Sequence, residues 1–557
     1  MSDDKATTES DAKSDKSDGS FVKHARTFSL LTLLSRFFGL ARDATLAWVF
    51  GFGPAMDAFV VAFMVPNLFR RLFGEGALAA AFIPQYTKLH QADVSAARRF
   101  AGLVLGWLHA ILLSVCLLGV LVLAGGVMLD VFTGRGELTV WLVCITLWYA
   151  PLVCGTAILG AMLQVHHRFG PPAAAPVILN IAIIGSAFVG GYVLSKDLAP
   201  WNEPITWVAI AVILAGVIQL AWQFAVLRRI DEHPSLTVLR SRTDEDRGHL
   251  KLLLKQWTPT VLGLAVFQLN TLADALIAMC FSGPTGETMN VLGTAISYPM
   301  EVGAVGVLGA TQRLYEFPLG VFGIAVATAL FPALSAAAED NDKFPVLLRQ
   351  GLRLSFFIGL PATVGLMLIR EPVARAIYYE SGQLTAEDAQ RIAWVLLGYA
   401  ASVWAYSLNH VFTRAFYAKG NPVTPMRVSV LMVFINFTLN LTLIWPLGTA
   451  GLAWSTAVCA VVQCVVLSTL IHQRYVKHPV DRSVFQSWVR VAILTAIFSP
   501  VIWGVLSFVE LRELSRMMTV VVILICVAIG GGTLFIGARV LRMDELRWVV
   551  SRRVKAD

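Results

Sequence analysis

Charged residues are scarce in this 557-residue chain. Only 14% of the residues are Asp, Glu, Lys or Arg, whereas 57% are hydrophobic and the mean hydropathy is +0.69. A soluble protein keeps about a quarter of its residues charged. No interval is long and polar enough for a soluble catalytic domain, the longest candidate being residues 228–250. This composition excludes a string of soluble domains and favours a chain that crosses a membrane many times.

Motifs for several kinds of chemistry are also missing. The seven cysteines lie in apolar segments without CxxC or Cys/His ligand spacing, and His166 and His167 border a basic loop without metal spacing. There is no GxxxxGK[ST] phosphate-binding loop. Residues 1–20 are polar and charged, so we expect residues 1–26 to form a solvated cytoplasmic tail rather than a cleavable signal peptide. The net charge of +8 fits basic loops, and no segment suggests a nucleic-acid partner.

Apolar segments of roughly 20 residues or more recur from residue 27 to residue 540. They predict an all-α polytopic membrane protein with about fourteen transmembrane helices. The predicted spans are 27–52, 56–84, 101–131, 138–163, 173–194, 205–227, 253–281, 300–335, 347–370, 391–416, 424–446, 449–472, 487–509 and 516–540.

Alternate connections between these spans differ in Lys and Arg content. The connections near residues 88–99, 166–168, 228–255, 343–353, 414–419 and 474–482 are basic, whereas those at 53–56, 282–299 and 447 hold no Lys or Arg. Basic connections face the cytoplasm. We therefore expect a multi-pass protein of the bacterial inner membrane with both termini cytoplasmic, which requires an even number of spans.

An internal repeat organises the chain. The segment Arg168–Pro176 before span five echoes Lys419–Pro425 before span eleven, and Arg71-Leu-Phe in span two echoes Arg313-Leu-Tyr in span eight. Partners lie six spans apart, which predicts two parallel six-helix lobes. The predicted domains are a first lobe at 27–227, a cytoplasmic linker at 228–252, a second lobe at 253–472, two extra helices at 487–540 and a cytoplasmic tail at 541–557.

Charges inside the spans are the main functional signal, because each costs at least about 2.5–3.5 kcal/mol at the bilayer centre. On a helix, Ser35, Gly39 and Arg42 share one face, and Arg36 and Asp43 form a second stripe. Arg71 and Glu75 are spaced to neutralise each other. Arg42, Arg70 and Arg313 outnumber nearby acids, so they are either interhelical salt-bridge partners or, as we favour, ligands of an anion. Planar guanidinium groups suit phosphate oxygens.

A second polar set lies on spans seven, eleven and twelve. Asp274, Asn436, Asn440 and the Ser455-Thr456 pair offer one carboxylate with amide and hydroxyl oxygens. Such a set either ligates a hard cation such as Na⁺ or hydrogen-bonds helices to one another.

The segment SRFFGLARDATLAWVFGFGPAMDAFVVAFMVPNLFRRLFGEGALAAAFIP resembles the signature region of the MurJ (MviN) family of lipid II flippases, within the multidrug/oligosaccharidyl-lipid/polysaccharide exporter superfamily. RLYEFPLGVFG at 313–323 and FYAKGNPVTP at 416–425 are similar to the family too. The resemblance implies a transporter, not an enzyme, that carries an undecaprenyl-pyrophosphate-linked peptidoglycan precursor to the periplasmic leaflet. It implies lipid II, membrane lipids and cell-wall synthesis proteins as partners, and a lipid-tail groove formed by spans thirteen and fourteen.

The resemblance also implies site residues. The family's cavity residues correspond to Ser35, Arg36, Arg42, Asp57, Arg70, Arg313 and Glu316, and its sodium site, the one cofactor considered, to Asp274, Asn436, Asn440 and Thr456. Gln312 stands where some members have an acid, and the glycine-rich stretch 284–310 looks longer than usual.

We expect alternating access, with the lobes rocking around a cationic cavity and the membrane potential or sodium as driving force. Two alternatives of the same superfamily stay open. One is a flippase for another polyprenyl-linked oligosaccharide, and the other is a drug/cation antiporter, which would want surplus carboxylates rather than arginines. A membrane glycosyltransferase would need a metal site in sizeable loops, which the sequence does not show.

Overall fold

The computed structural model describes residues 34–74, 77–132, 134–190, 203–239, 243–291, 293–378, 384–511 and 513–550. The predicted N-terminal tail at 1–26 lies outside these residues. The chain divides into two compact units. Unit 1 comprises residues 1–50 and 54–268, and unit 2 comprises residues 51–53 and 269–557.

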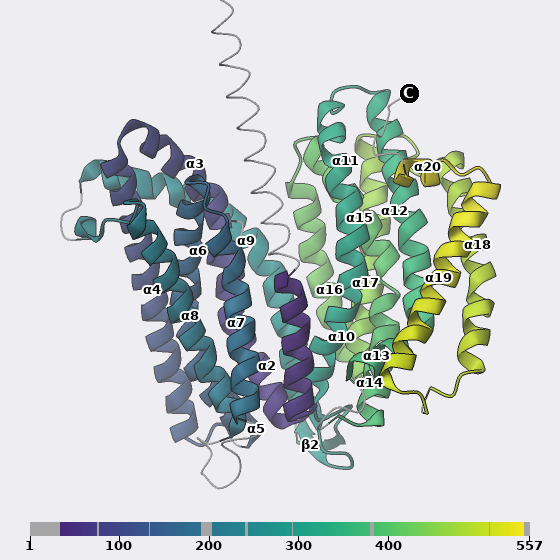
Figure 1. The fold of residues 1–557 in the computed structure, drawn as a ribbon, viewed down its shortest axis with the longest axis horizontal. Coiled ribbons are helices and arrows are strands. Elements are labelled where there is room, and N and C mark those ends of the chain that lie inside the picture. The colour runs from purple at the N-terminus through teal and green to yellow at the C-terminus, as the bar shows by residue number, and fades with distance from the viewer. Residues whose placement is uncertain are drawn as a thin grey trace, which may run out of the picture. The chain divides into compact units, whose positions relative to one another are not determined.

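Unit 1 is a bundle of helices. Its described elements are a helix at 34–50, α2 (Pro54–Phe69), a π-helical segment (Arg70–Gly74), α3 (Ala77–Ala92), α4 (Val94–Met128), α5 (Arg135–Thr146), α6 (Tyr149–Val165), α7 (Gly170–Phe188), α8 (Pro204–Arg229), a 3-10 turn (Leu236–Leu239) and most of α9 (Asp244–Cys280). The helices α4, α6, α7 and α8 run side by side (Figure 1). The core of unit 1 also holds stacked aromatic rings, such as Phe82 of α3 against Phe100 of α4 with centroids 5.5 Å apart.

Unit 2 contains the end of α9 and a second bundle. Its described helices are α10 (Ala304–Pro318), a π-helical segment (Leu319–Ile324), α11 (Ala325–Ala336), α12 (Lys343–Leu368), α13 (Arg370–Tyr378), α14 (Ala386–Ala400), α15 (Val403–Ala418), α16 (Val423–Leu447), α17 (Thr449–Arg474), α18 (Arg482–Ser507), α19 (Arg516–Val540) and α20 (Asp544–Val550). The helices α18 and α19, yellow in Figure 1, pack against α12 and α13. The segment 541–557, predicted as a tail, therefore includes a helix, α20, whose Glu545 is buried.

Short strands connect α9 to α10, where the sequence predicts no strand. Strand β1 (Ser282–Gly283) pairs in parallel with β4 (Met300–Glu301), and β2 (Thr288–Val291) pairs antiparallel with β3 (Thr294–Ser297). Gly293, at φ 87°, makes the tight turn between β2 and β3, a conformation that glycine adopts without a steric cost. The unusual glycine-rich stretch thus forms a small hairpin, and the helix of span eight begins only at Ala304.

Ten segments among the described residues are long and apolar enough to cross a membrane. They correspond to predicted spans three to six and nine to fourteen, so the polytopic all-α class is confirmed. The other four predicted spans are one, two, seven and eight. These spans carry Arg42, Arg70, Asp274 and Arg313; parts of spans one and two lie outside the described residues, and spans two and eight are each divided by a π-helical segment.

Spans two and eight are each interrupted by a π-helical segment, which supports the predicted correspondence between them. In span two, Pro66 lies one turn before the break and lacks the N–H that would bond the Ala62 carbonyl. The Thr146 hydroxyl donates to that carbonyl at 2.8 Å instead. Such π segments are rare and concentrate at functional sites. In span eight, Pro318 immediately precedes the π-helical segment.

Candidate functional site

One face of the helix at 34–50 is organised around Asn180 of α7. The Asn180 side chain donates to the Ser35 carbonyl at 3.4 Å and accepts from Arg42 Nη1 at 3.2 Å. Between them, a Cβ on Gly39 would lie 3.8 Å from the Asn180 amide nitrogen. Ser35, Gly39 and Arg42 therefore share a face, as their spacing predicts. Asn180 itself was missed, although an amide inside the apolar run of span five is a signal that a sequence can show.

Arg42 forms an ion pair with its chain neighbour Asp43. Its Nη2 lies 2.6 Å and its Nε 2.8 Å from Asp43 Oδ1, and its guanidinium also stands over the Phe63 ring at 5.7 Å. The two charged side chains are only 12% and 18% exposed. We expected Asp43 to share a helical stripe with Arg36 without pairing with it, and Asp43 instead pairs with its chain neighbour Arg42. Arg42 is thus neutralised in this conformation rather than surplus.

Arg70 and Arg71 lie on the π-helical segment of span two. Arg70 is partly buried, and the neighbouring Phe69 carbonyl accepts from the Cys154 thiol of α6 at 3.6 Å. Arg71 Nη1 donates to Gln268 Oε1 of α9 at 3.0 Å. Its predicted partner, Glu75, lies outside the described residues. The amide of Gln268 therefore gives Arg71 a partner that its own helix could not reveal.

Two more predicted cavity residues differ in exposure. Asp57 lies in the first turn of α2 and is completely buried. Arg36 is exposed on the helix at 34–50.

In unit 2, Arg313 and Glu316 form a loose pair on α10. Their Nη1 and Oε2 atoms are 3.5 Å apart, and the side chains are 46% and 51% exposed. An exposed pair of this kind contributes at most about 1 kcal/mol, so Arg313 can change partners at little cost. Arg42 and Arg70 belong to unit 1 and Arg313 to unit 2, so a shared site for the three stays a prediction.

The predicted cation set largely meets inside unit 2. Asn440 Nδ2 donates to Asp274 Oδ1 at 2.5 Å and to Asn436 Oδ1 at 3.2 Å, and all three side chains are buried. The Ser455 hydroxyl bonds both asparagines. Thr456 instead donates to the Leu452 carbonyl of its own helix at 3.0 Å. The cluster is thus Asp274, Asn436, Asn440 and Ser455, with Thr456 beside it.

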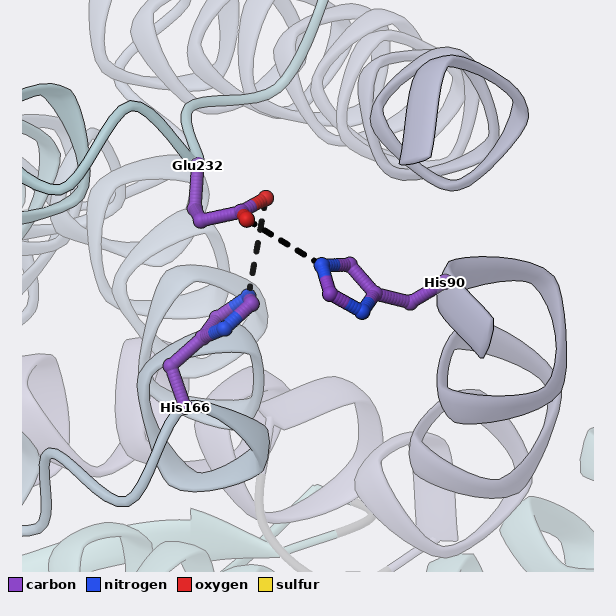
Figure 2. A group of neighbouring side chains, drawn as sticks. All are labelled: His90, His166 and Glu232. Carbon is purple, nitrogen blue, oxygen red and sulfur yellow. Dashed lines mark hydrogen bonds and ion pairs between the residues drawn. The ribbon is translucent and has the colours of Figure 1, made fainter. Parts of the chain in front are cut away.

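A further cluster of titratable groups was missed by sequence reasoning. His90, His166 and Glu232 offer three ligand atoms that lie within 4.8 Å of one another (Figure 2). His166 shows no metal spacing along the chain because its neighbours in space are 76 and 66 residues away. Only the folded bundle brings them together.

The comparisons with known proteins agree with this architecture. The sequence profile of the family "Lipid II flippase MurJ" matches residues 46–523. The chain belongs to the MurJ family. The probable lipid II flippase MurJ of Vibrio cholerae serotype O1 is 30% identical over 480 residues, which cover 83% of this chain and 85% of that protein. The lipid II flippase MurJ of Burkholderia cenocepacia is 30% identical over 465 residues, covering 81% of this chain and 84% of that protein.

Solved structures show the same fold. A lipid II flippase MurJ in an inward closed conformation has a TM-score of 0.71 at 23% identity and covers 93% of this chain and 99% of its own. An inward-facing multidrug resistance MATE family transporter of the MOP superfamily has a TM-score of 0.62 at 16% identity and covers 80% of this chain and 98% of its own. The expected MurJ function, a lipid II flippase of the bacterial inner membrane rather than an enzyme, is confirmed at the level of the family.

Proposed function

We propose that this MurJ-family chain carries the undecaprenyl-pyrophosphate-linked peptidoglycan precursor from the cytoplasmic to the periplasmic leaflet by alternating access. Arg42, Arg70 and Arg313 bind the pyrophosphate. The polyprenyl tail stays in the lipid, so only the headgroup crosses. An inside-negative potential favours outward movement of an anion by about 2.3 kcal/mol per charge per 100 mV.

The arrangement of Arg42 is the observation that carries this proposal. Its guanidinium is shielded from solvent and is contacted by a carboxylate, an amide and an aromatic ring. A carboxylate on one edge is the arrangement that a phosphate would copy, because both anions accept charge-assisted bonds from the same fork. Asp43 therefore serves as the internal partner that takes Arg42 when the phosphate leaves.

Nearby carboxylates give the arginines an alternative ion-pair partner when no phosphate is bound. Asp43 holds Arg42 and Glu316 stands beside Arg313 in the conformation described here. When the precursor binds, its phosphate oxygens replace these carboxylates, and when it leaves, the carboxylates return. The buried Asp57, together with Ser35 and Arg36, completes the proposed headgroup-binding set. Release of the precursor then costs less free energy than it would if the guanidinium were left inside the membrane without an anionic partner.

The Asp274 cluster fits a sodium ion by its chemistry. One carboxylate, two amide groups and a hydroxyl are hard oxygen donors. Asp274, Asn436, Asn440 and Ser455 would hold the ion, with Thr456 as the predicted ligand beside them. When bound, sodium would neutralise the one carboxylate of this group, and turning the Asn440 amide would bring its oxygen to the ion.

The finer topology belongs to the same proposal. We propose fourteen spans with both termini cytoplasmic, two parallel six-helix lobes at 27–227 and 253–472, and a lipid-tail groove formed by spans thirteen and fourteen. The packing of α18 and α19 against α12 and α13 supports an added pair of helices on the second lobe. Lipid II, surrounding membrane lipids and cell-wall synthesis proteins are the proposed partners.

Depletion of the protein tests the proposed function. Cells depleted of it should accumulate the lipid-linked peptidoglycan precursor in the cytoplasmic leaflet, as measured by leaflet-resolved labelling. Accumulation of a different polyprenyl-linked oligosaccharide would favour the related flippase instead. Unchanged lipid intermediates together with increased sensitivity to cationic drugs would favour the antiporter.

A further inference from the structure

Three helix ends of unit 1 meet at the cluster of His90, His166 and Glu232. His90 lies in the last turn of α3, His166 directly follows α6, and Glu232 follows α8. Figure 2 shows the Glu232 carboxylate interacting with both imidazole rings. The side chains are 26%, 13% and 17% exposed, so the group is shielded but reachable from solvent.

Two of these positions are fixed by the backbone. Glu232 N–H bonds the Leu227 carbonyl at 2.9 Å, and the preceding Asp231 has φ 53°. The end of α6 repeats this geometry, because Arg168 N–H bonds the Leu163 carbonyl at 2.8 Å and His167 has φ 56°. Both are Schellman motifs, which end a helix with one left-handed residue. The ligand-bearing residues therefore stand on rigid helix ends rather than on loops.

The spacing of the ligand atoms matches a tetrahedral metal ion. Glu232 Oε1 lies 3.1 Å from His90 Nε2, and Glu232 Oε2 lies 3.8 Å from His166 Nε2. Zinc bonds nitrogen at about 2.0–2.1 Å and carboxylate oxygen at about 2.0–2.2 Å, so two ligands on one tetrahedral ion lie about 3.3–3.5 Å apart. The two separations, each to a different carboxylate oxygen, lie on either side of that value, and the three ligand atoms lie within 4.8 Å of one another, so side-chain rotations are needed to close the set around one ion.

The polar groups around the cluster complete this picture. Glu232 Oε2 is buried and accepts no hydrogen bond within the described part of the chain, although Arg98 Nε stands 3.5 Å away. Arg98 also pairs with Asp231 and so holds the turn that carries Glu232. The Tyr86 hydroxyl is hydrogen-bonded to His166 Nε2 at 3.2 Å, so the hydroxyl must turn away when that nitrogen binds an ion. Ligating carboxylates usually have such outer partners.

We propose that His90, His166 and Glu232 form a binding site for a divalent transition metal of the zinc class. A set of two imidazoles and one carboxylate binds zinc and its neighbours cobalt and nickel in preference to magnesium or calcium. The ion ties the ends of α3, α6 and α8 together. The helix α3 is the part of span two that follows the π-helical segment carrying Arg70. The metal therefore holds the end of span two to α6 and α8.

Direct metal binding tests this site. Full-length protein in detergent, freed of any histidine tag and treated with chelator, is titrated with Co²⁺ alone and then with Zn²⁺. We expect the visible absorption of tetrahedral Co²⁺ at one ion per chain, its displacement by Zn²⁺, and a higher Tm with Zn²⁺. An unmodified protein that binds no Co²⁺ or Zn²⁺ would overturn the proposal.

Variants locate the ion. His90→Gln and Glu232→Gln should each weaken binding by at least about tenfold, which is the low end of the effect typical of losing an outer partner. His167→Asn is the matched control, since His167 is exposed, neighbours the site and has a left-handed φ that asparagine tolerates. Wild-type binding by His90→Gln, or an equal loss in His167→Asn, would contradict the assignment. If a ligand variant does not fold, the titration of the unmodified protein still decides whether the ion binds.

Discussion

Replacing Asp43 by asparagine should tighten the binding of a pyrophosphate headgroup. Asp43 occupies the edge of Arg42 with two contacts to one oxygen, at 2.6 and 2.8 Å. A hydrogen bond to a charged group contributes about 1.5–3 kcal/mol net, and a phosphate must displace these contacts before it can use the same edge. Since 1.4 kcal/mol is a factor of ten, the Asp43→Asn variant should bind about tenfold tighter or more.

The same change should slow transport, because Asp43 no longer takes Arg42 back when the headgroup leaves. Binding is measured with the purified protein and labelled lipid II, and turnover by the appearance of the lipid in the outer leaflet of vesicles. Asp130→Asn is the control, since Asp130 is exposed at the end of α4 with φ 53°, which asparagine adopts readily. It removes the same charge without touching Arg42.

An unchanged or weaker affinity in Asp43→Asn, at a Tm like that of the unmodified protein, would refute the competition between carboxylate and phosphate. In that case Asp43 would neither compete with the phosphate for Arg42 nor stabilise the fold. The expected combination of tighter binding with slower turnover separates the two roles, because a structural pair would lose stability and affinity together.

Three further outcomes follow from other contacts. Glu545→Ala should lower the free energy of unfolding by about 2–3 kcal/mol, because the half-exposed Asp544 is then the carboxylate that remains beside Arg353, whereas Asp544→Ala should cost about 0–1 kcal/mol in the same thermal assay. Burial raises the pKa of Asp246, but hydrogen bonds from Arg99 and Thr243 outweigh it and lower that pKa from 3.8 to about 2. The ionised Asp246 therefore stabilises the fold above pH 4, and this contribution is lost as the pH falls toward 2. Asp246→Asn should remove the dependence of Tm on pH that Asp246 causes in that window. Sodium but not choline should raise the Tm through Asp274, an effect that Asp274→Ala should abolish; equal responses to the two cations in the unmodified protein would leave only hydrogen bonds between helices.

The sequence predicts the positions of the helices far better than the side-chain contacts between them. Hydropathy identifies ten of the spans, because an apolar run of the right length has few other stable conformations in lipid. Helical spacing also predicts the shared face of Ser35, Gly39 and Arg42, and the meeting of Asp274 with Asn436 and Asn440. These features depend on local periodicity or on scarce polar groups that must find one another in an apolar bundle.

Other contacts depend on information that the spacing does not contain. Arg42 and Asp43 are adjacent and point about 100° apart on a helix, so their pairing depends on side-chain rotamers. Asn180 and Gln268 reach arginines that lie 138 and 197 residues away. The hairpin at 288–297 forms within the predicted connection at 282–299, because Gly293 permits a turn that other residues resist.

The arginines test the central claim most directly. Arg42, Arg70 and Arg313 are each replaced by alanine and by lysine, and the variants are expressed in cells depleted of their own flippase. Growth, protein abundance in the membrane and the leaflet distribution of the lipid-linked precursor are measured together. If the arginines bind the pyrophosphate, each alanine variant should remain inserted and abundant yet fail to support growth, with the precursor retained in the cytoplasmic leaflet. Lysine should restore function only in part, because it supplies a point charge instead of a bidentate fork. Full complementation by all three alanine variants would contradict the account.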